Sequence, residues 1–130
     1  VTNRVQPYLR DGDTLYVAGV GTLSTGHMLL NKVTRQTPAD AAAVLLAHEP
    51  DVAQWRSSKF VMQFSGHTHG GQINLMGNMP LIRPWMGKLY PSGLYDLDGY
   101  FVYTNRGLGM TRLPIRLNCP PEITVFTFSS

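Results

Sequence analysis

Residues 64–72 have the sequence FSGHTHGGQ, in which His67 and His69 stand one residue apart among glycines at the end of an apolar run. In a β-strand, residues i and i+2 share a face, so a His-x-His pair at a strand end can direct both imidazoles to one place. Neutral imidazole is the commonest metal ligand, and the glycines allow a sharp backbone bend and close approach of a ligand. A pair of this kind is a weak signal by itself, so the rest of the sequence decides whether it marks a metal site.

A third histidine, His48, follows another predicted strand. Residues 41–46 and residues 59–64 are short apolar runs of the length and composition typical of buried strands. In open α/β sheets, binding sites lie at the carboxyl ends of the strands. We therefore expect His48 and His67 to meet at one edge of a sheet.

Residues 66–72 resemble the GHTHGGQ signature of the calcineurin-like metallophosphoesterases, in the bacterial branch typified by membrane-associated phosphodiesterases and UDP-diacylglucosamine pyrophosphatase-like enzymes. Three further blocks agree with that family in order. They are LLAHEPD at residues 45–51, YTNRGLG at residues 103–109 and LPIRLNCPPEITVF at residues 113–126. The similarity covers most of residues 14–128, and four ordered blocks are far more specific than one pair of histidines.

The resemblance implies a dinuclear centre with two divalent metal ions, in which His48 and His67 would ligate one ion and His69 the other. Mixed imidazole and carboxylate ligation suits Mn, Fe or Zn, and the sequence does not choose among them. Each ligating imidazole also needs an acceptor for its second nitrogen. Backbone carbonyls, Glu49 and Asp51 are the alternatives for that role.

Enzymes of this family also carry an Asp-x-His, a Gly-Asp and a Gly-Asn-His block, which supply most other ligands and the general acid. None of these blocks occurs in the 130 residues. We therefore expect residues 1–130 to be the C-terminal part of a single metallophosphoesterase domain whose N-terminal half is absent. The expected fold class is α/β (α+β): half of a four-layer αββα sandwich, with a mixed sheet and a C-terminal antiparallel hairpin.

Two side chains outside the histidine motif are candidates for substrate contact. Arg106, in a glycine-flanked loop, is the preferred catalytic and phosphate-binding candidate among Arg106, Arg112 and Arg116, with a structural or solvated arginine as the alternative. Trp85 lies in a long predicted loop at residues 74–90 and is a candidate for binding an apolar part of the substrate, or for covering the core.

Composition limits the remaining possibilities. The chain has 43% hydrophobic and 15% charged residues and a net charge of +3, which is typical of one globular domain that accepts an anionic substrate. The basic residues are few and dispersed, so we do not expect a nucleic-acid partner. Cys119 is the single cysteine and predicts a structural thiol, and His27 predicts an exposed or capping residue.

Local patterns predict the other elements. Asp98-Gly99 between two apolar runs is a strong hairpin signal, because glycine accepts the positive φ of such a turn. The further predictions are a strand at 15–20, a helix at 26–35, a short helix at 52–55 and a last strand at 122–128.

The sequence therefore predicts a metal-dependent phosphoesterase that hydrolyses a phosphodiester or pyrophosphate bond, including lipid-linked substrates, with the isolated chain inactive. The alternative is a non-catalytic metal-binding or interaction module that retains the fold. The expected partner is the missing N-terminal half or a second copy of the chain. Membrane association follows only from the family branch.

Overall fold

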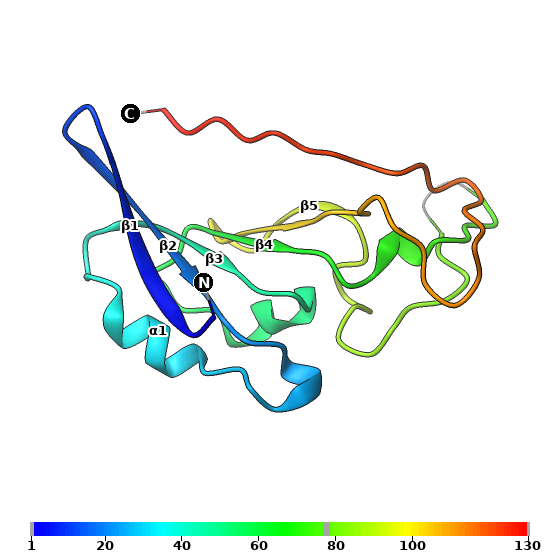
Figure 1. The fold of residues 1–130 in the computed structure, drawn as a ribbon, viewed down its shortest axis with the longest axis horizontal. Coiled ribbons are helices and arrows are strands. Elements are labelled where there is room, and N and C mark those ends of the chain that lie inside the picture. The colour runs from blue at the N-terminus through cyan, green and yellow to red at the C-terminus, as the bar shows by residue number, and fades with distance from the viewer. Residues whose placement is uncertain (1, 77–78, 130) are drawn as a thin grey trace.

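The computed structural model describes residues 2–76 and 79–129 of the 130-residue chain. Within these ranges the chain forms six β-strands, one α-helix and three short 3-10 helices (Figure 1). In chain order they are β1 (Arg4–Arg10), β2 (Asp13–Gly19), η1 (Leu23–Thr25), α1 (Leu30–Gln36), β3 (Ala42–Leu46), η2 (Pro50–Trp55), β4 (Met62–Ser65), η3 (His69–Gly71), β5 (Gly93–Asp96) and β6 (Phe101–Thr104).

All six strands belong to one mixed sheet with the order β1-β2-β3-β4-β6-β5. The four inner strands β2, β3, β4 and β6 run parallel, whereas the edge strands β1 and β5 pair antiparallel with their neighbours. This arrangement confirms the predicted mixed α/β sheet. Because β3 and β4 are parallel neighbours, their carboxyl ends meet at the same edge of the sheet.

The predicted hairpin is confirmed as β5 and β6. Asp96 pairs with Phe101 in register, and Asp98 and Gly99 between the strands have φ values of 57° and 86°. Two successive positive φ values at an Asp-Gly pair are typical of the tight turns that match the twist of a hairpin.

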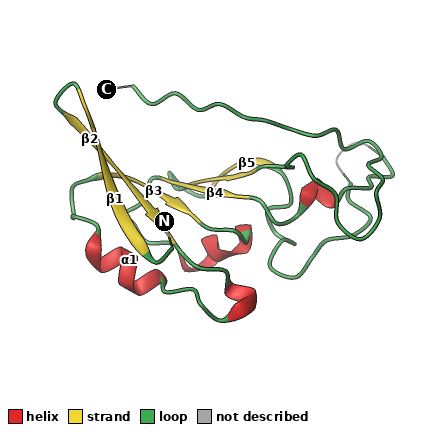
Figure 2. Cartoon of the chain, in the orientation of Figure 1, coloured by secondary structure: helices red, strands yellow, loops and turns green. Residues whose placement is uncertain are grey.

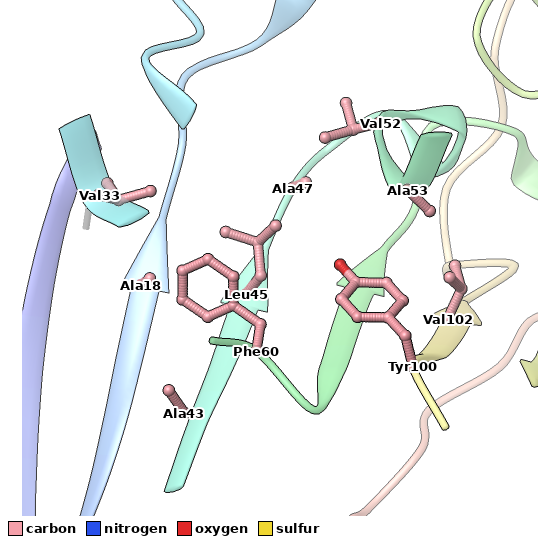
Figure 3. Packing of buried hydrophobic residues seen from close by; sticks show 10 residues of the cluster. All are labelled: Ala18, Val33, Ala43, Leu45, Ala47, Val52, Ala53, Phe60, Tyr100 and Val102. Carbon is pink, nitrogen blue, oxygen red and sulfur yellow. The ribbon is translucent and has the colours of Figure 1, made fainter. Parts of the chain in front are cut away.

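The core lies between the sheet and the segments α1 and η2 (Figure 3). Ala18 and Leu45 project from β2 and β3 toward Val33 of α1 and the ring of Phe60, whereas Val102 of β6 lies beside Tyr100, and all of these side chains are buried. Small residues on the strands leave room for the helix and the aromatic ring. This face of the sheet is therefore closed by the chain itself.

The predicted helix at 26–35 is wrong in its first turn. Leu23–Thr25 form η1 instead, and Gly26 with a φ of 72° ends that turn, so α1 begins only at Leu30. The amides of Leu23 and Ser24 donate to the carboxylate of Glu49. This contact with a distant residue fixes the turn, and residue-by-residue patterns do not reveal it.

The predicted strand at 122–128 is also wrong. The segment is extended but belongs to no sheet, and its residues 123–129 make no backbone–backbone hydrogen bond within the described part of the chain (Figure 2). It runs over the face of the sheet opposite α1, where the ring of Phe126 lies 4.7 Å from that of Phe64 and 4.8 Å from that of Tyr103. The alternating apolar residues of this segment are therefore consistent with an extended backbone, but no described strand pairs with it.

Strand β1 was not predicted, because it contains Pro7 and no apolar run, a composition that only an edge strand tolerates. Residues 74–90 are irregular as predicted where they are described, and residues 77 and 78 of that loop lie outside the described ranges. Among the described helices, none is long and apolar enough to cross a membrane.

Candidate metal centre

His48 and His67 meet at the carboxyl edge of the sheet, as predicted. Backbone pairing continues beyond β3 and β4, because Ala47 N donates to Phe64 O at 3.0 Å and Gly66 N donates to His48 O at 3.1 Å. This extension fixes the two segments side by side. As a result, His67 Nδ1 lies 3.2 Å from His48 Nε2, with the rings edge to face.

Backbone carbonyls fix the protonated nitrogen of two histidines. His67 Nε2 lies 2.8 Å from Trp85 O, and His69 Nδ1 lies 3.1 Å from Gly109 O. A carbonyl oxygen only accepts, so the proton must sit on Nε2 of His67 and on Nδ1 of His69. The lone pair of His67 then lies on Nδ1, which faces His48, and the lone pair of His69 lies on Nε2.

The carboxylates that were the alternative acceptors are bound elsewhere. Glu49 accepts from Thr22 Oγ1 and from two amides of η1, and Asp51 accepts from the amides of Lys88, Leu89 and Tyr90. Burial by itself would raise the pKa of Glu49, but these hydrogen bonds outweigh it and lower the pKa below its ordinary value. Both carboxylates therefore hold loops around the histidines.

The pKa of His48 is also lowered. Burial is the largest cause, the neighbouring His67 adds to it, and Glu49 opposes it. A lowered pKa favours the neutral imidazole, which is the form that binds a metal.

All three histidines line one cavity of about 600 Å³. Only His48 and His67 face each other at hydrogen-bond distance, while the ring of His69 is turned to Gly109. Within residues 2–76 and 79–129, no group of three or more histidine, cysteine, aspartate or glutamate side chains is close enough to hold a metal ion. The chain therefore presents a histidine pair and a third histidine on the same cavity wall.

The donor chemistry of the pair fits a metal ion. Two imidazole nitrogens bound to one tetrahedral zinc at about 2.0–2.1 Å are about 3.3–3.4 Å apart. The observed separation of 3.2 Å between His48 Nε2 and His67 Nδ1 is close to that value. Because the lone pair of His67 lies on Nδ1, His48 Nε2 is the donor in this contact.

The motif owes its shape to unusual backbone conformations. His67, His69 and Gln72 all have positive φ, at 68°, 50° and 58°. Such values are uncommon for residues with a side chain and cluster at functional sites. A Cβ on Gly71 would lie 2.1 Å from Pro80 Cβ, so this glycine allows the loop at residue 80 to approach.

The cations on the cavity wall are Arg83 and Arg112. Arg106, the preferred candidate from the sequence, pairs through Nε with the carboxylate of Glu122 at 2.5 Å and does not line this cavity. Arg112 was considered without being preferred, and Arg83 was missed. The one sequence feature at Arg83 is its position before Pro84, in the long loop predicted at residues 74–90, and this feature alone does not place it on the cavity wall.

Trp85 is connected to the site through its backbone. Its carbonyl accepts from His67, while its indole side chain is 58% exposed and does not line the cavity. Substrate binding by Trp85 and catalysis by Arg106 stay predictions.

Several curated proteins are similar to this chain. The metallophosphoesterase YkuE of Bacillus subtilis is 43% identical over 123 residues, which are 94% of this chain and 43% of YkuE. The phosphodiesterase YaeI of Escherichia coli is 33% identical over 84% of this chain and 39% of its own length, and a bovine transmembrane protein with metallophosphoesterase domain is 32% identical over 88% and 27%. No protein-family model and no solved structure matches.

The chain spans less than half the length of each of these relatives. Their similarity nevertheless extends over most of the 130 residues, including the strand ends and the loop that bring the histidines together. The chain therefore belongs to the calcineurin-like metallophosphoesterases.

Proposed function

We propose that the protein containing this chain hydrolyses a phosphodiester or pyrophosphate bond at a dinuclear centre of divalent metal ions. The observation that carries the proposal is the contact of His48 Nε2 with His67 Nδ1, at the wall of a cavity that also contains His69 and two arginines. The relative YaeI is named a phosphodiesterase, which supports the same reaction class.

In this proposal, His48 and His67 hold one ion and His69 holds the other. When bound, such a pair of ions lowers the pKa of a water molecule and neutralises phosphate oxygens. The loop carbonyls of Trp85 and Gly109 keep the ring protons away from the ligating nitrogens. The remaining oxygen ligands come from outside the chain, so these 130 residues alone are inactive.

Substrate binding is assigned to the rest of the cavity wall. Arg83 and Arg112 can each present a fork of donors to phosphate oxygens. Ile73, Ile82 and Leu113 line the same cavity and supply apolar surface beside the cations. We infer a phosphoester with an anionic centre and an apolar substituent, and lipid-linked phosphoesters belong to that class.

The face of the sheet opposite α1 supports a partner. Strand register places Leu46, Phe64 and Tyr103 in one row across this face, and Val44, Met62 and Phe101 in the next. The segment that carries Phe126 packs on this face at Phe64, while Leu46 and Phe101 are 40% and 37% exposed on it. A second polypeptide, either the remaining half of the domain or another copy of the chain, is proposed to cover it.

The test is hydrolysis of bis-p-nitrophenyl phosphate by the purified protein in the presence and absence of Mn²⁺ or Zn²⁺. We expect metal-dependent activity that is lost in the double variant His67→Ala with His69→Ala. His27→Ala is the matched control, because His27 is exposed and does not line the cavity. If a protein that also contains the remaining oxygen ligands binds the metal but does not hydrolyse the substrate, the non-catalytic metal-binding module would be favoured instead.

A further inference from the structure

The guanidinium of Arg116 is surrounded by backbone carbonyls. Within the described residues the two ion pairs are Arg10 with Asp11 and Arg106 with Glu122, so Arg116 has no carboxylate partner there. Its Nη2 donates to the carbonyls of Arg106 at 2.9 Å, Gly107 at 3.0 Å and Gly109 at 2.6 Å. Its Nη1 donates to Cys119 O at 3.2 Å and, at the longer distance of 3.4 Å, to His69 O.

These carbonyls belong to three separate segments of the chain. Residues 106–109 follow β6, residues 116–119 lie ten residues further on, and His69 begins η3. Only arginine carries several donors in one rigid plane, so it can hold carbonyls of different segments at once. Arg116 thus ties the loop after β6 to the histidine turn.

One carbonyl connects this arginine to the metal centre. Gly109 O accepts from Arg116 Nη2 and also from His69 Nδ1. The position of that oxygen therefore decides which nitrogen of His69 carries the proton. Cys119 contacts the same turn, since its buried Sγ donates to His69 O at 3.3 Å.

We propose that Arg116 is a positioning residue: its guanidinium holds the Gly109 carbonyl at His69 Nδ1, which keeps the lone pair of His69 on Nε2, the ring nitrogen left for a metal. Without this arginine, the loop at residues 106–109 is released and His69 populates both tautomers. The inference deepens the proposed function, on which it rests for the role of His69 as a ligand.

The first measurement is the tautomer of His69 in metal-free protein labelled with ¹⁵N histidine, at about pH 8, where imidazoles are neutral. Long-range ¹H–¹⁵N correlations distinguish the protonated from the unprotonated ring nitrogen. We expect the proton of His69 on Nδ1 in the wild type and a mixture of tautomers in Arg116→Gln. Arg35→Gln, on the exposed surface of α1, is the matched control and should leave His69 unchanged.

The second measurement is Mn²⁺ affinity by calorimetric titration. Loss of an outer contact to a ligating histidine typically lowers metal affinity about 10- to 100-fold, and we expect a loss of that size in Arg116→Gln. Arg116→Lys keeps the charge but lacks the planar fork, so it should not restore the tautomer or the affinity. Full rescue by lysine would show that charge alone matters and would overturn the proposal.

A wild-type His69 with its proton on Nε2 would overturn the proposal directly, however the variants fold. An unchanged His69 tautomer in both folded Arg116 variants would do the same. A wild-type protein that binds no Mn²⁺, but whose His69 proton leaves Nδ1 in Arg116→Gln, would overturn the proposed function and sustain the positioning role. The two failures are therefore distinguishable.

Discussion

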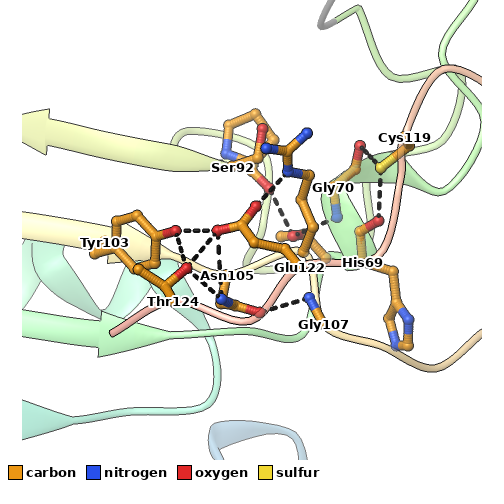
Figure 4. A network of polar contacts seen from close by, with 12 residues as sticks. His69, Gly70, Ser92, Tyr103, Asn105, Gly107, Cys119, Glu122 and Thr124 are labelled. Carbon is orange, nitrogen blue, oxygen red and sulfur yellow. Dashed lines mark hydrogen bonds and ion pairs between the residues drawn. The ribbon is translucent and has the colours of Figure 1, made fainter. Parts of the chain in front are cut away.

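Glu122 shows how a single carboxylate joins the C-terminal segment to the sheet. It accepts from the hydroxyls of Tyr103 and Thr124, from Asn105 Nδ2 at 3.3 Å and from Arg106 Nε at 2.5 Å (Figure 4). Burial by itself would raise the pKa of Glu122, but the hydrogen bonds from Tyr103 and Arg106 outweigh it and lower the pKa. The charged carboxylate is therefore the form that the folded protein stabilises.

The lowered pKa predicts how stability depends on pH. The contribution of Glu122 is present above the pKa of an unfolded glutamate, about 4.3, and is lost as the pH falls through the lower folded value. We expect Glu122→Gln to reduce the free energy of unfolding by about 1.5 to 3 kcal/mol at neutral pH. Urea unfolding of both proteins between neutral pH and pH 3 measures this, and a difference that does not shrink in acid would contradict it.

The candidate site could be predicted in part at the level of residues. The contact between His48 and His67 could be predicted from the sequence. Two apolar strands are each followed by a histidine, and parallel neighbouring strands bring their carboxyl ends together. The placement of Arg83 and Arg106 does not follow in this way. It depends on long loops and on the partner Glu122, which lies 16 residues from Arg106.

At the level of elements, the strands with strong local signals were predicted and those that depend on distant partners were not. β2, β3 and the β5–β6 hairpin have apolar runs or a turn dipeptide of their own. β1 depends on pairing with β2 at the edge of the sheet, and the start of α1 depends on the contact of η1 with Glu49. Periodicity alone cannot supply either contact.

The loop that carries Trp85 gives an element-scale prediction. The Asp51 carboxylate accepts from the amides of Lys88, Leu89 and Tyr90, and thereby holds the segment whose Trp85 carbonyl orients His67. We expect Asp51→Ala to speed hydrogen exchange at residues 88–90 and to weaken Mn²⁺ binding, because the acceptor for His67 Nε2 becomes mobile.

Asp96→Ala is the matched control for this variant. Asp96 also accepts from a backbone amide, that of Gly99, but it lies in the β5–β6 hairpin and does not line the cavity. It should change exchange only at the hairpin. Equal Mn²⁺ affinity in Asp51→Ala and Asp96→Ala would show that the loop has no part in holding the metal.

At the scale of the whole molecule, the two faces of the sheet differ. One face is closed by α1 and η2, and on the other face the extended segment with Phe126 crosses the apolar rows. That segment turns Phe126 toward Phe64, while Ile123 and Val125 are 77% and 85% exposed. An extended apolar segment whose backbone groups are unpaired within the described chain is typical of a surface that pairs with another polypeptide.

The proposed cover of this face predicts that the 130-residue chain associates when it is produced alone. Sedimentation velocity should show concentration-dependent association, reduced by Ile123→Lys with Val125→Lys, because charges at these positions disfavour an apolar contact. Leu9→Lys is the matched control: Leu9 is also 77% exposed but lies on β1, at the opposite edge of the sheet from β5. Adding the remaining half of the domain should replace self-association and restore metal-dependent hydrolysis. A chain that stays monomeric at all concentrations, or one whose association Leu9→Lys abolishes equally well, would mean that this face needs no partner.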